Sequence, residues 1–403
     1  MASGAEAARP ESSGTGHGSD EPSPPLPPGA DEVTRKPRPW LFCLAAYAVS
    51  RLFVAVGALA AVIWPARGVL PVSLSQFAKR RDGWWYLYIA RHGYPRTLHP
   101  LALSHVRWSP WAFFPGYPVL LRGAHLLLPI RYGLLAVGVS AVLGLTAVRS
   151  VYHLGQTVSG AETARWSAAL FAAWPGSAVL SMAYSEGLFI TAAAVALAAL
   201  VRRTWWLAGL AGLVAAVARP AGVAILAAAI VAAATDLRRT RSPRALLAPA
   251  LTVAGPLAFA LYGRARTGDI LVWRHAENLW HQRLDLGVGF FTSWGTALVT
   301  GGRKLVRSAT TAMGLTAVVA AATITLRSRR RLDLVLVAYT AVALAQMLGY
   351  SLVFTKPRFV LALLPLFVWV AMAGARRRLA VACAVCLVLL GVFSYAYLTV
   401  LTP

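Results

Sequence analysis

The segment RRTWWLAGLAGLVAAVARPAGVAILAAAIVAAATDLRRTRSPR, residues 202–244, decides the fold class of this chain. Two apolar runs, 205–218 and 221–235, are separated mainly by Arg219 and Pro220. Neither run contains a charged residue, and arginines stand at both outer ends of the segment. Uncharged apolar runs of this kind are typical of helices in a bilayer. The segment therefore predicts a transmembrane helical hairpin whose two outer ends lie on the same side.

The composition of the whole chain agrees with this prediction. Of 403 residues, 58% are hydrophobic and only 13% are charged, whereas soluble proteins contain about 25% charged residues. This balance excludes an ordinary cytosolic enzyme. The runs that reach or approach a spanning length are 40–64, 132–149, 164–182, 187–201, 205–218, 221–235, 245–262, 309–326, 332–354, 358–375 and 379–400. We therefore expect an all-α polytopic membrane protein with about 11 transmembrane helices.

Positive charge sets the expected orientation. The formal net charge is +25, and short cytoplasmic loops of membrane proteins are rich in Lys and Arg. We therefore interpret most of this charge as an orientation signal and expect no nucleic-acid partner. The basic clusters lie at 35–38, 202–203, 238–244, 327–331 and 376–378. They share one side only if the proline-broken stretch 111–129 does not cross, so we expect a re-entrant or interfacial helix there. The N-terminus is then cytoplasmic and the C-terminus extracytoplasmic.

The chain divides into a polar tail and a membrane domain. Residues 1–38 are rich in Gly, Ser, Pro, Glu and Ala and lack apolar periodicity, which predicts a disordered cytoplasmic tail. Residues 39–403 form the transmembrane domain. Within it, 65–131 is a long first extracytoplasmic loop that carries short interfacial helices, and 263–308 is a second large extracytoplasmic segment. These two segments have the most room for a polar site.

Few acidic residues of the membrane domain are candidates for carboxylate chemistry. The chain has 14 Asp and Glu residues, and six of them lie in the first 32 positions. Asp82 lies among aromatic residues of the first outer loop. A partly shielded carboxylate there can act as a general base on an alcohol, or it can simply pair with Arg80 or Arg81 in an amphipathic helix. Glu186 lies at an outer helix end, where it is either functional or part of a helix cap.

Cations on the outer side indicate an anionic ligand. Arg219, Lys356 and Arg358 oppose the positive-inside trend, and phosphate is the anion that such side chains most readily bind. The three cysteines lie in apolar runs and the outer histidines are scattered. We therefore expect no metal and no other cofactor.

Five motifs in order resemble one family. They are Asp82-Gly83-Trp84-Trp85-Tyr86 with Ile89-Ala90 and Gly93-Tyr94, then Phe113-Phe114-Pro115-Gly116-Tyr117-Pro118, Tyr184-Ser185-Glu186-Gly187-Leu188-Phe189, Arg219-Pro220 and Lys356-Pro357-Arg358-Phe359. This order resembles the PIG-V-type mannosyltransferases, meaning the second mannosyltransferase of GPI-anchor synthesis and its bacterial relatives. These enzymes belong to the GT-C class of membrane glycosyltransferases. The family pattern has Trp where this chain has Arg81 before the acid.

The resemblance implies a GT-C-like bundle and a transfer of mannose, or a related sugar, from a polyprenyl-phosphate donor to an acceptor hydroxyl on a lipid or glycan. The reaction would take place on the extracytoplasmic face of the cell membrane, with inversion. Asp82 would be the general base, Glu186 would orient it or bind the sugar, and Arg219, Lys356 and Arg358 would bind the donor phosphate. The implied substrate-binding residues are Trp84, Trp85, Tyr86, Tyr117, Tyr184, His275 and Glu277. The last two also fit a solvated outer helix.

Two other functions stay open at this stage. A secondary transporter or lipid flippase would use short, proline-broken helices near the membrane midplane. The acids of this chain instead lie at outer helix ends, and we find no internal repeat. A non-catalytic subunit of a transferase complex is the second alternative, because Arg81 departs from the family pattern.

Overall fold

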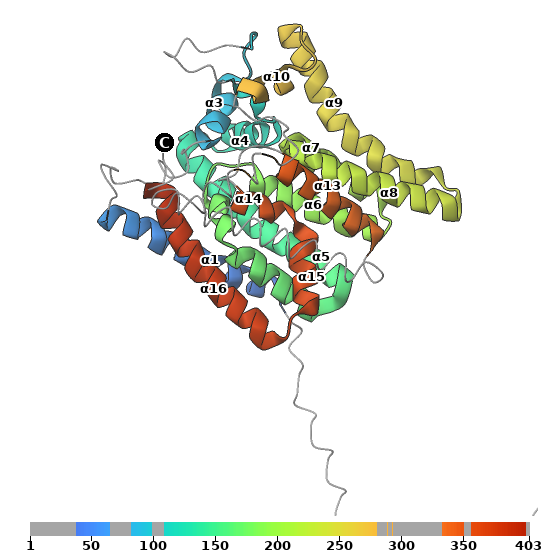
Figure 1. The fold of residues 1–403 in the computed structure, drawn as a ribbon. Coiled ribbons are helices and arrows are strands. Elements are labelled where there is room, and N and C mark those ends of the chain that lie inside the picture. Colours follow the sequence, from blue (N-terminus) through green and yellow to red (C-terminus); the bar gives the residue numbers. More distant parts are fainter. Residues whose placement is uncertain are drawn as a thin grey trace, which may run out of the picture. The chain divides into compact units, whose positions relative to one another are not determined.

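The computed structural model describes residues 38–64, 82–98, 109–279, 333–349 and 356–399, together with Val288 and Thr292. Every regular element in these residues is helical, and no strand occurs among them (Figure 1). The all-α class predicted from the sequence is therefore confirmed. The predicted span 309–326 and the tail 1–37 lie outside the described residues, as do parts of the loops 65–131 and 263–308.

Five of the described helices are long and apolar enough to cross a membrane. They are α1 (Pro39–Ile63), α5 (Tyr132–Ala173), α8 (Val223–Thr240) with its preceding turn η3 (Pro220–Gly222), α9 (Leu247–Thr267) with its preceding turn η4 (Pro243–Leu246), and α16 (Arg376–Thr399). A sixth candidate is a bent pair, η2 (Pro175–Ser181) and α6 (Glu186–Val201), whose axes differ by 110°. Shorter apolar helices are α7 (Trp205–Ala218), α13 (Leu334–Gly349) and α15 (Leu364–Ala373).

The helix α5 covers the predicted span 132–149 and the first part of the predicted span 164–182, and its backbone is broken between them. Its backbone leaves helical geometry at Ser159 and Gly160, and Gly160 has a φ of 86°. Glycine adopts this left-handed region without the steric cost of a side chain. After the break the chain folds back so tightly that a Cβ on Gly155 would lie 2.9 Å from the Cα of Ala164. The two halves of α5 therefore pack against each other.

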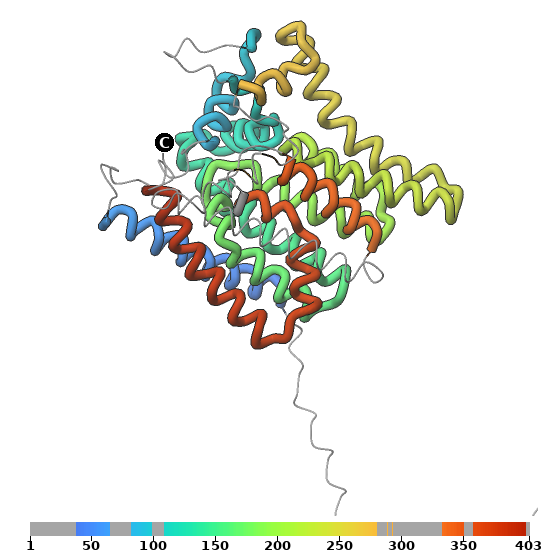
Figure 2. The backbone as a smooth tube through the Cα atoms, viewed as in Figure 1, coloured from blue at the N-terminus to red at the C-terminus, as the bar shows by residue number. Residues whose placement is uncertain are grey.

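Small residues allow close helix packing, as membrane helices require. In Figure 2 the first and last helices, α1 and α16, lie side by side, and both contact α5. A Cβ on Gly57 of α1 would clash with the backbone oxygen of Gly391 in α16. The α7 helix packs against both α6 and α9, and α8 packs against α13. The hairpin of α7 and α8 matches the one predicted from residues 202–244.

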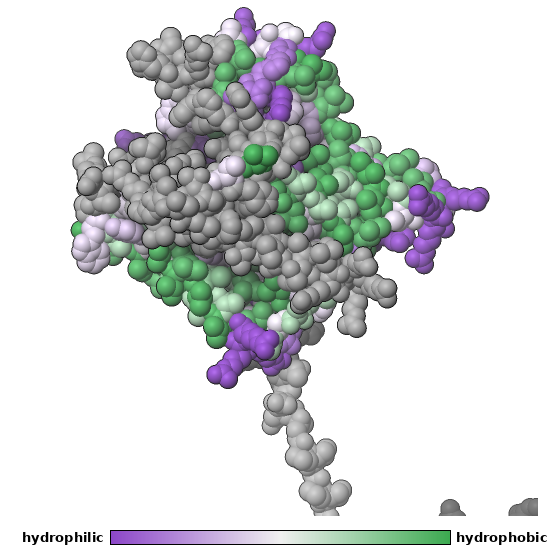
Figure 3. Space-filling model, in the orientation of Figure 1, coloured by the Kyte–Doolittle hydropathy of each residue, from purple (hydrophilic) through white to green (hydrophobic). Residues whose placement is uncertain are grey.

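Apolar residues make up much of the coloured surface in Figure 3, and hydrophilic residues gather at its extremities. On α1, the exposed side chains include Leu52, Val56 and Leu59. On α16 they include Val381, Val385, Val388 and Val392. An exposed apolar face of this extent suits a lipid environment better than water.

Short helices lie between the long ones. They are α3 (Asp82–His92), η1 (Pro110–Ala112), α4 (Gly116–Leu127), α10 (Val272–Leu279), α14 (Lys356–Phe359) and η5 (Val360–Ala362). Three of them, α3, α4 and α10, lie close together in Figure 1. The 12 residues of α4 extend about 18 Å, which is less than the roughly 30 Å hydrocarbon core. The expectation that 111–129 does not cross stays a prediction.

Candidate functional site

Four charged side chains from four distant segments meet in one network. The Nη1 atom of Arg358 donates a hydrogen bond to Oδ2 of Asp82 at 2.6 Å. The Nε atom of Arg358 lies 3.1 Å from Oε1 of Glu186. Arg219 forms an ion pair with the same Glu186 oxygen. Two acids and two guanidinium groups thus neutralise one another, and we call these four residues the Asp82 network.

Both carboxylates lie at helix beginnings. Asp82 is the first residue of α3, and Glu186 is the first residue of α6. The positive end of a helix dipole favours a carboxylate at such a position. Ser185 occupies the N-cap position of α6, but its side chain makes no capping hydrogen bond. Its hydroxyl instead hydrogen-bonds the hydroxyl of Tyr86 at 2.7 Å, which ties α3 to the beginning of α6.

The two arginines lie where proline interrupts the helices. Arg219 is extended (φ −158°, ψ 153°) between α7 and η3, as expected for a residue that precedes proline. Gln346 of α13 holds this turn by donating to the backbone oxygen of Pro220 at 3.3 Å. Arg358 lies in the short helix α14. Both guanidinium groups lie over the ring of Phe359, at 5.8 and 5.2 Å from its centre.

Burial differs between the two acids of the network. The side chain of Glu186 is 4% exposed, whereas that of Asp82 is 23% exposed. Arg219 and Arg358 are each 15% exposed. Glu186 therefore anchors both arginines from inside the protein. Asp82 is the acid of this network that a substrate reaches more readily.

The aromatic residues of α3 divide into an exposed and a buried set. Trp84 is 43% exposed and stacks on Tyr88, with ring centres 5.5 Å apart. Trp85 and Tyr86 are buried, and Trp85 stacks on Phe113 at 5.9 Å. Burial raises the pKa of the Tyr86 phenol, so its hydroxyl stays protonated at neutral pH. Of these three predicted substrate-binding residues, Trp84 presents the most open surface.

Tyr117 and Tyr184, two more predicted substrate-binding residues, are buried with bonded hydroxyls. The Tyr117 hydroxyl hydrogen-bonds Ser140 Oγ at 3.1 Å. The Tyr184 hydroxyl hydrogen-bonds the Tyr397 hydroxyl at 2.7 Å. The guanidinium of Arg358 lies over the Tyr184 ring at 5.1 Å, which places Tyr184 directly against the network.

His275 and Glu277 of α10 lie apart from the network in the part of the chain that the structure describes. The Nδ1 atom of His275 lies 2.6 Å from Oδ2 of Asp269. Glu277 is buried and pairs with Arg274 at 3.4 Å, and burial raises its pKa. Lys356 begins α14, but its side chain lies outside the described residues.

Arg51 and Tyr397 belong to none of the five motifs, yet both contact residues next to the site. Arg51 lies in the middle of α1 and donates to the Ser177 backbone oxygen at 2.9 Å and to Ser181 Oγ at 2.7 Å. It thereby fixes η2, which also contacts α14. A single cation inside an apolar run, such as Arg51, indicates in the sequence a residue with a polar partner inside the bundle. The link between Tyr184 and Tyr397 has no such signal, because a tyrosine near a helix end is common in membrane proteins.

Metal-ligating side chains do not cluster in the described ranges. Among these residues, no group of three or more His, Cys, Asp and Glu side chains could hold a metal ion. The acids of the network each face a guanidinium instead.

The fold is similar to that of solved membrane glycosyltransferases, although no protein family and no curated protein matches the sequence. ArnT from Cupriavidus metallidurans, solved with undecaprenyl phosphate, is 15% identical, with a TM-score of 0.51 over 86% of this chain and 62% of that chain. The Archaeoglobus fulgidus oligosaccharyltransferase in its apo form is 14% identical, with a TM-score of 0.50 over 90% of this chain and 56% of that chain.

This chain has the GT-C fold. The multi-pass membrane architecture and the fold class implied by the five motifs are therefore confirmed. The chain spans only about three fifths of the length of these two structures. At such low sequence identity the similarity shows the fold alone.

Proposed function

We propose that this protein is an integral membrane glycosyltransferase. It moves a mannosyl or related residue from a polyprenyl-phosphate donor to the hydroxyl group of a lipid or glycan acceptor, on the extracytoplasmic face. The observation that carries this proposal is the Asp82 network, which joins a partly exposed carboxylate to two arginines. The GT-C fold supports the reaction class, and the resemblance to PIG-V-type enzymes supports mannose.

In the proposed reaction Asp82 is the general base. The acceptor oxygen forms a bond to the anomeric carbon while its proton passes to the Asp82 carboxylate. The bond between the anomeric carbon and the phosphate oxygen breaks, and its electron pair stays on the lipid phosphate. Attack from the side opposite the leaving group inverts the configuration at the anomeric carbon.

The leaving phosphate needs cations. Arg219 and Arg358 both pair with the Glu186 carboxylate. Guanidinium groups bind phosphate oxygens through several N–H donors. Lys356 adds a further positive charge two residues before Arg358. Preorganised donors of this kind stabilise charge that develops in a transition state without reorganisation of solvent.

Glu186 acts in this proposal as a positioning residue. It is nearly inaccessible and contacts both arginines, so it fixes the direction in which they present their remaining N–H groups. The exposed ring of Trp84, two residues after Asp82 in the sequence, is the best placed of the α3 aromatics to contact the sugar or its lipid carrier.

The direct test is sugar transfer by the purified full chain in proteoliposomes that contain polyprenyl-phosphate-mannose and membrane lipid extract. We compare the wild type with Asp82→Asn and with a matched control, Asp269→Asn, whose partly exposed acid pairs with His275. Loss of labelled product in Asp82→Asn alone supports the proposal, and undiminished transfer in this variant removes Asp82 as the base.

The same proteoliposomes separate the alternative functions. Movement of labelled donor across the bilayer without a transfer product supports a flippase. Donor binding with neither movement nor product, restored to transfer by a second membrane protein, supports a non-catalytic subunit.

A further inference from the structure

A second basic region lies at the helix ends remote from the Asp82 network. The turn between α6 and α7, together with the last turns of α8 and the segment that follows it up to η4, carries six arginines and one acid, Asp236. The arginines are Arg202, Arg203, Arg238, Arg239, Arg241 and Arg244. The α7 helix connects this region to Arg219 and has 14 residues, which corresponds to a separation of about 21 Å. The region is therefore distinct from the candidate active site.

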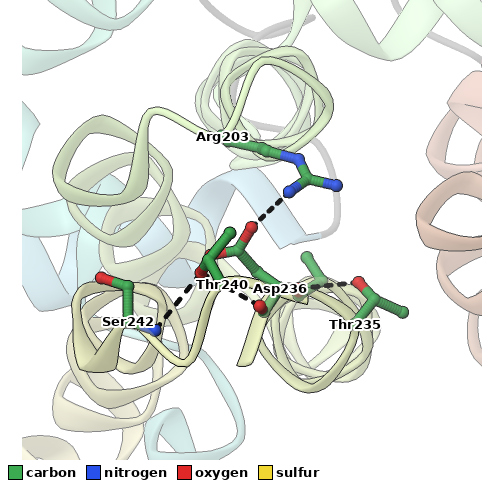
Figure 4. A network of polar contacts seen from close by, with 6 residues as sticks. Arg203, Thr235, Asp236, Thr240 and Ser242 are labelled. Carbon is green, nitrogen blue, oxygen red and sulfur yellow. Dashed lines mark hydrogen bonds and ion pairs between the residues drawn. The ribbon is translucent and has the colours of Figure 1, made fainter. Parts of the chain in front are cut away.

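A polar network holds the two turns together (Figure 4). Arg203 forms an ion pair with Asp236, whose second oxygen accepts a hydrogen bond from Thr240 Oγ1 at 3.0 Å. The Ser242 backbone N–H donates to Thr240 Oγ1 at 3.3 Å. Arg203 and Arg241 both adopt positive φ angles, 59° and 55°, a conformation that is uncommon for residues other than glycine. The turns are thus built as a defined surface.

Between these turns lies an open groove of about 740 Å³ with a charged part and an apolar part. Arg203 and Arg244 provide the charge, and Trp205, Trp206, Leu246 and Leu247 provide much of the apolar lining. Trp206 is 57% exposed. Arg203 directs one nitrogen to Asp236, yet its side chain is still 44% exposed. Arg244 makes no ion pair with a described acid. N–H donors of both arginines therefore remain available to a ligand.

We propose that this groove binds an anionic membrane phospholipid. The phosphate lies between Arg203 and Arg244, and an acyl chain follows Trp206, Leu246 and Leu247. Three observations favour this occupant. The region carries a large excess of positive charge, which complements a phosphate. Trp205 and Trp206 begin the apolar helix α7 next to the arginines, as Trp residues of membrane helices commonly do at the membrane–water interface. Val253 and Leu257 follow the lining residue Ala250 by three and seven positions on α9 and are exposed, so they share its helix face and a lipid tail can extend along them.

The lipid, rather than a free phosphate ion, fits the apolar part of the groove. An inorganic phosphate satisfies the arginines but leaves the surface of Trp206 and the leucines without a partner. This site does not depend on the proposed transfer reaction, since none of its residues belongs to the Asp82 network.

The test is lipid binding to the purified full chain in detergent, followed by native mass spectrometry during titration with phosphatidylglycerol or phosphatidylcholine. We expect wild-type protein to retain phosphatidylglycerol preferentially. Since each basic residue near an anionic surface contributes about 1 kcal/mol, the variant Arg203→Gln/Arg244→Gln is expected to bind it about 30-fold more weakly. The single variant Arg244→Gln leaves the pair between Arg203 and Asp236 intact and is expected to weaken binding about fivefold.

The matched control is Arg377→Gln/Arg378→Gln, which removes the same charge from exposed residues at the beginning of α16. Its phosphatidylglycerol binding should equal that of the wild type. Equal losses in both double variants would show nonspecific attraction and overturn the proposal. A second arm adds inorganic phosphate and the variant Trp206→Ala. Displacement of the lipid by millimolar phosphate, with no effect of Trp206→Ala, would assign the site to free phosphate and overturn the lipid proposal.

Discussion

Arg358 and Asp82 lie 276 positions apart in the chain, yet the guanidinium of one donates to the carboxylate of the other at 2.6 Å. In the proposed reaction these two groups serve different parts of the substrate, since the arginine binds the phosphate and the acid accepts a proton. A phosphate that takes the N–H donors of Arg358 competes with Asp82 for them. Donor binding and release of the base are thus coupled in the proposed mechanism.

The coupling predicts opposite effects on donor binding for the two partners. Asp82→Asn removes a competitor for Arg358, so the Kd of the donor should fall or stay unchanged while the transfer rate falls about 10²–10⁴-fold. Arg358→Gln should raise the Kd about tenfold or more, since a hydrogen bond to a charged group contributes about 1.5–3 kcal/mol. Titration with labelled polyprenyl-phosphate-mannose measures both constants. A weakening in Asp82→Asn as large as that in Arg358→Gln contradicts the coupling.

Replacing Glu186 tests the anchor of the network. In Glu186→Gln, Arg219 loses the carboxylate with which it pairs in this network, whereas Arg358 keeps that of Asp82. Removal of one partner from a buried ion pair costs about 3–5 kcal/mol, so the Tm in detergent should fall by several degrees. Glu162→Gln is the matched control, because its pair with Arg376 is largely exposed and such pairs add little stability. Equal Tm values for the two variants would exclude an anchoring role for Glu186.

Arg51 is expected to fix the bent segment that leads to Glu186. Its side chain bonds the backbone of Ser177 and the hydroxyls of Ser177 and Ser181. Arg51→Met retains much of the apolar stem but leaves these groups without the guanidinium, which should destabilise the protein by about 2–4 kcal/mol. We expect a lower Tm and a lower transfer rate with an unchanged Kd for the donor. Arg51→Lys should recover part of both, and a donor Kd that rises with the loss of Arg51 argues against a purely positioning role.

We expect Glu277 to make a pH-dependent contribution to the free energy of unfolding. Burial raises its pKa above the ordinary value of 4.5, so the folded state favours the protonated acid. Its contribution to stability is complete below the unfolded pKa and is lost as pH rises through the folded pKa. Glu277→Gln should therefore show a smaller decline in Tm than the wild type between about pH 4 and 7. Parallel Tm curves for the two proteins would contradict the raised pKa.

The sequence by itself determined most of the apolar helices that the structure describes and the short set of charged candidates. The predicted run 205–218 coincides with α7, and Pro115 lies at the break between η1 and α4, although α4 continues through Pro118. A bilayer forces every backbone group to be satisfied within its own helix, so apolar length alone is a strong signal. Because acids are scarce in the chain, the sequence also indicated Asp82 and Glu186 as candidate site residues.

Only the tertiary structure decided which of these residues meet. Asp82 had Arg80 and Arg81 as sequence neighbours, but its described partner is Arg358. Tyr184 lies against the network with Tyr397 behind it, whereas His275 and Glu277 pair with residues of their own segment. The physical reason is that such contacts depend on how helices cross and where they break. Those features arise from packing between segments far apart in the chain, which local periodicity and charge do not encode.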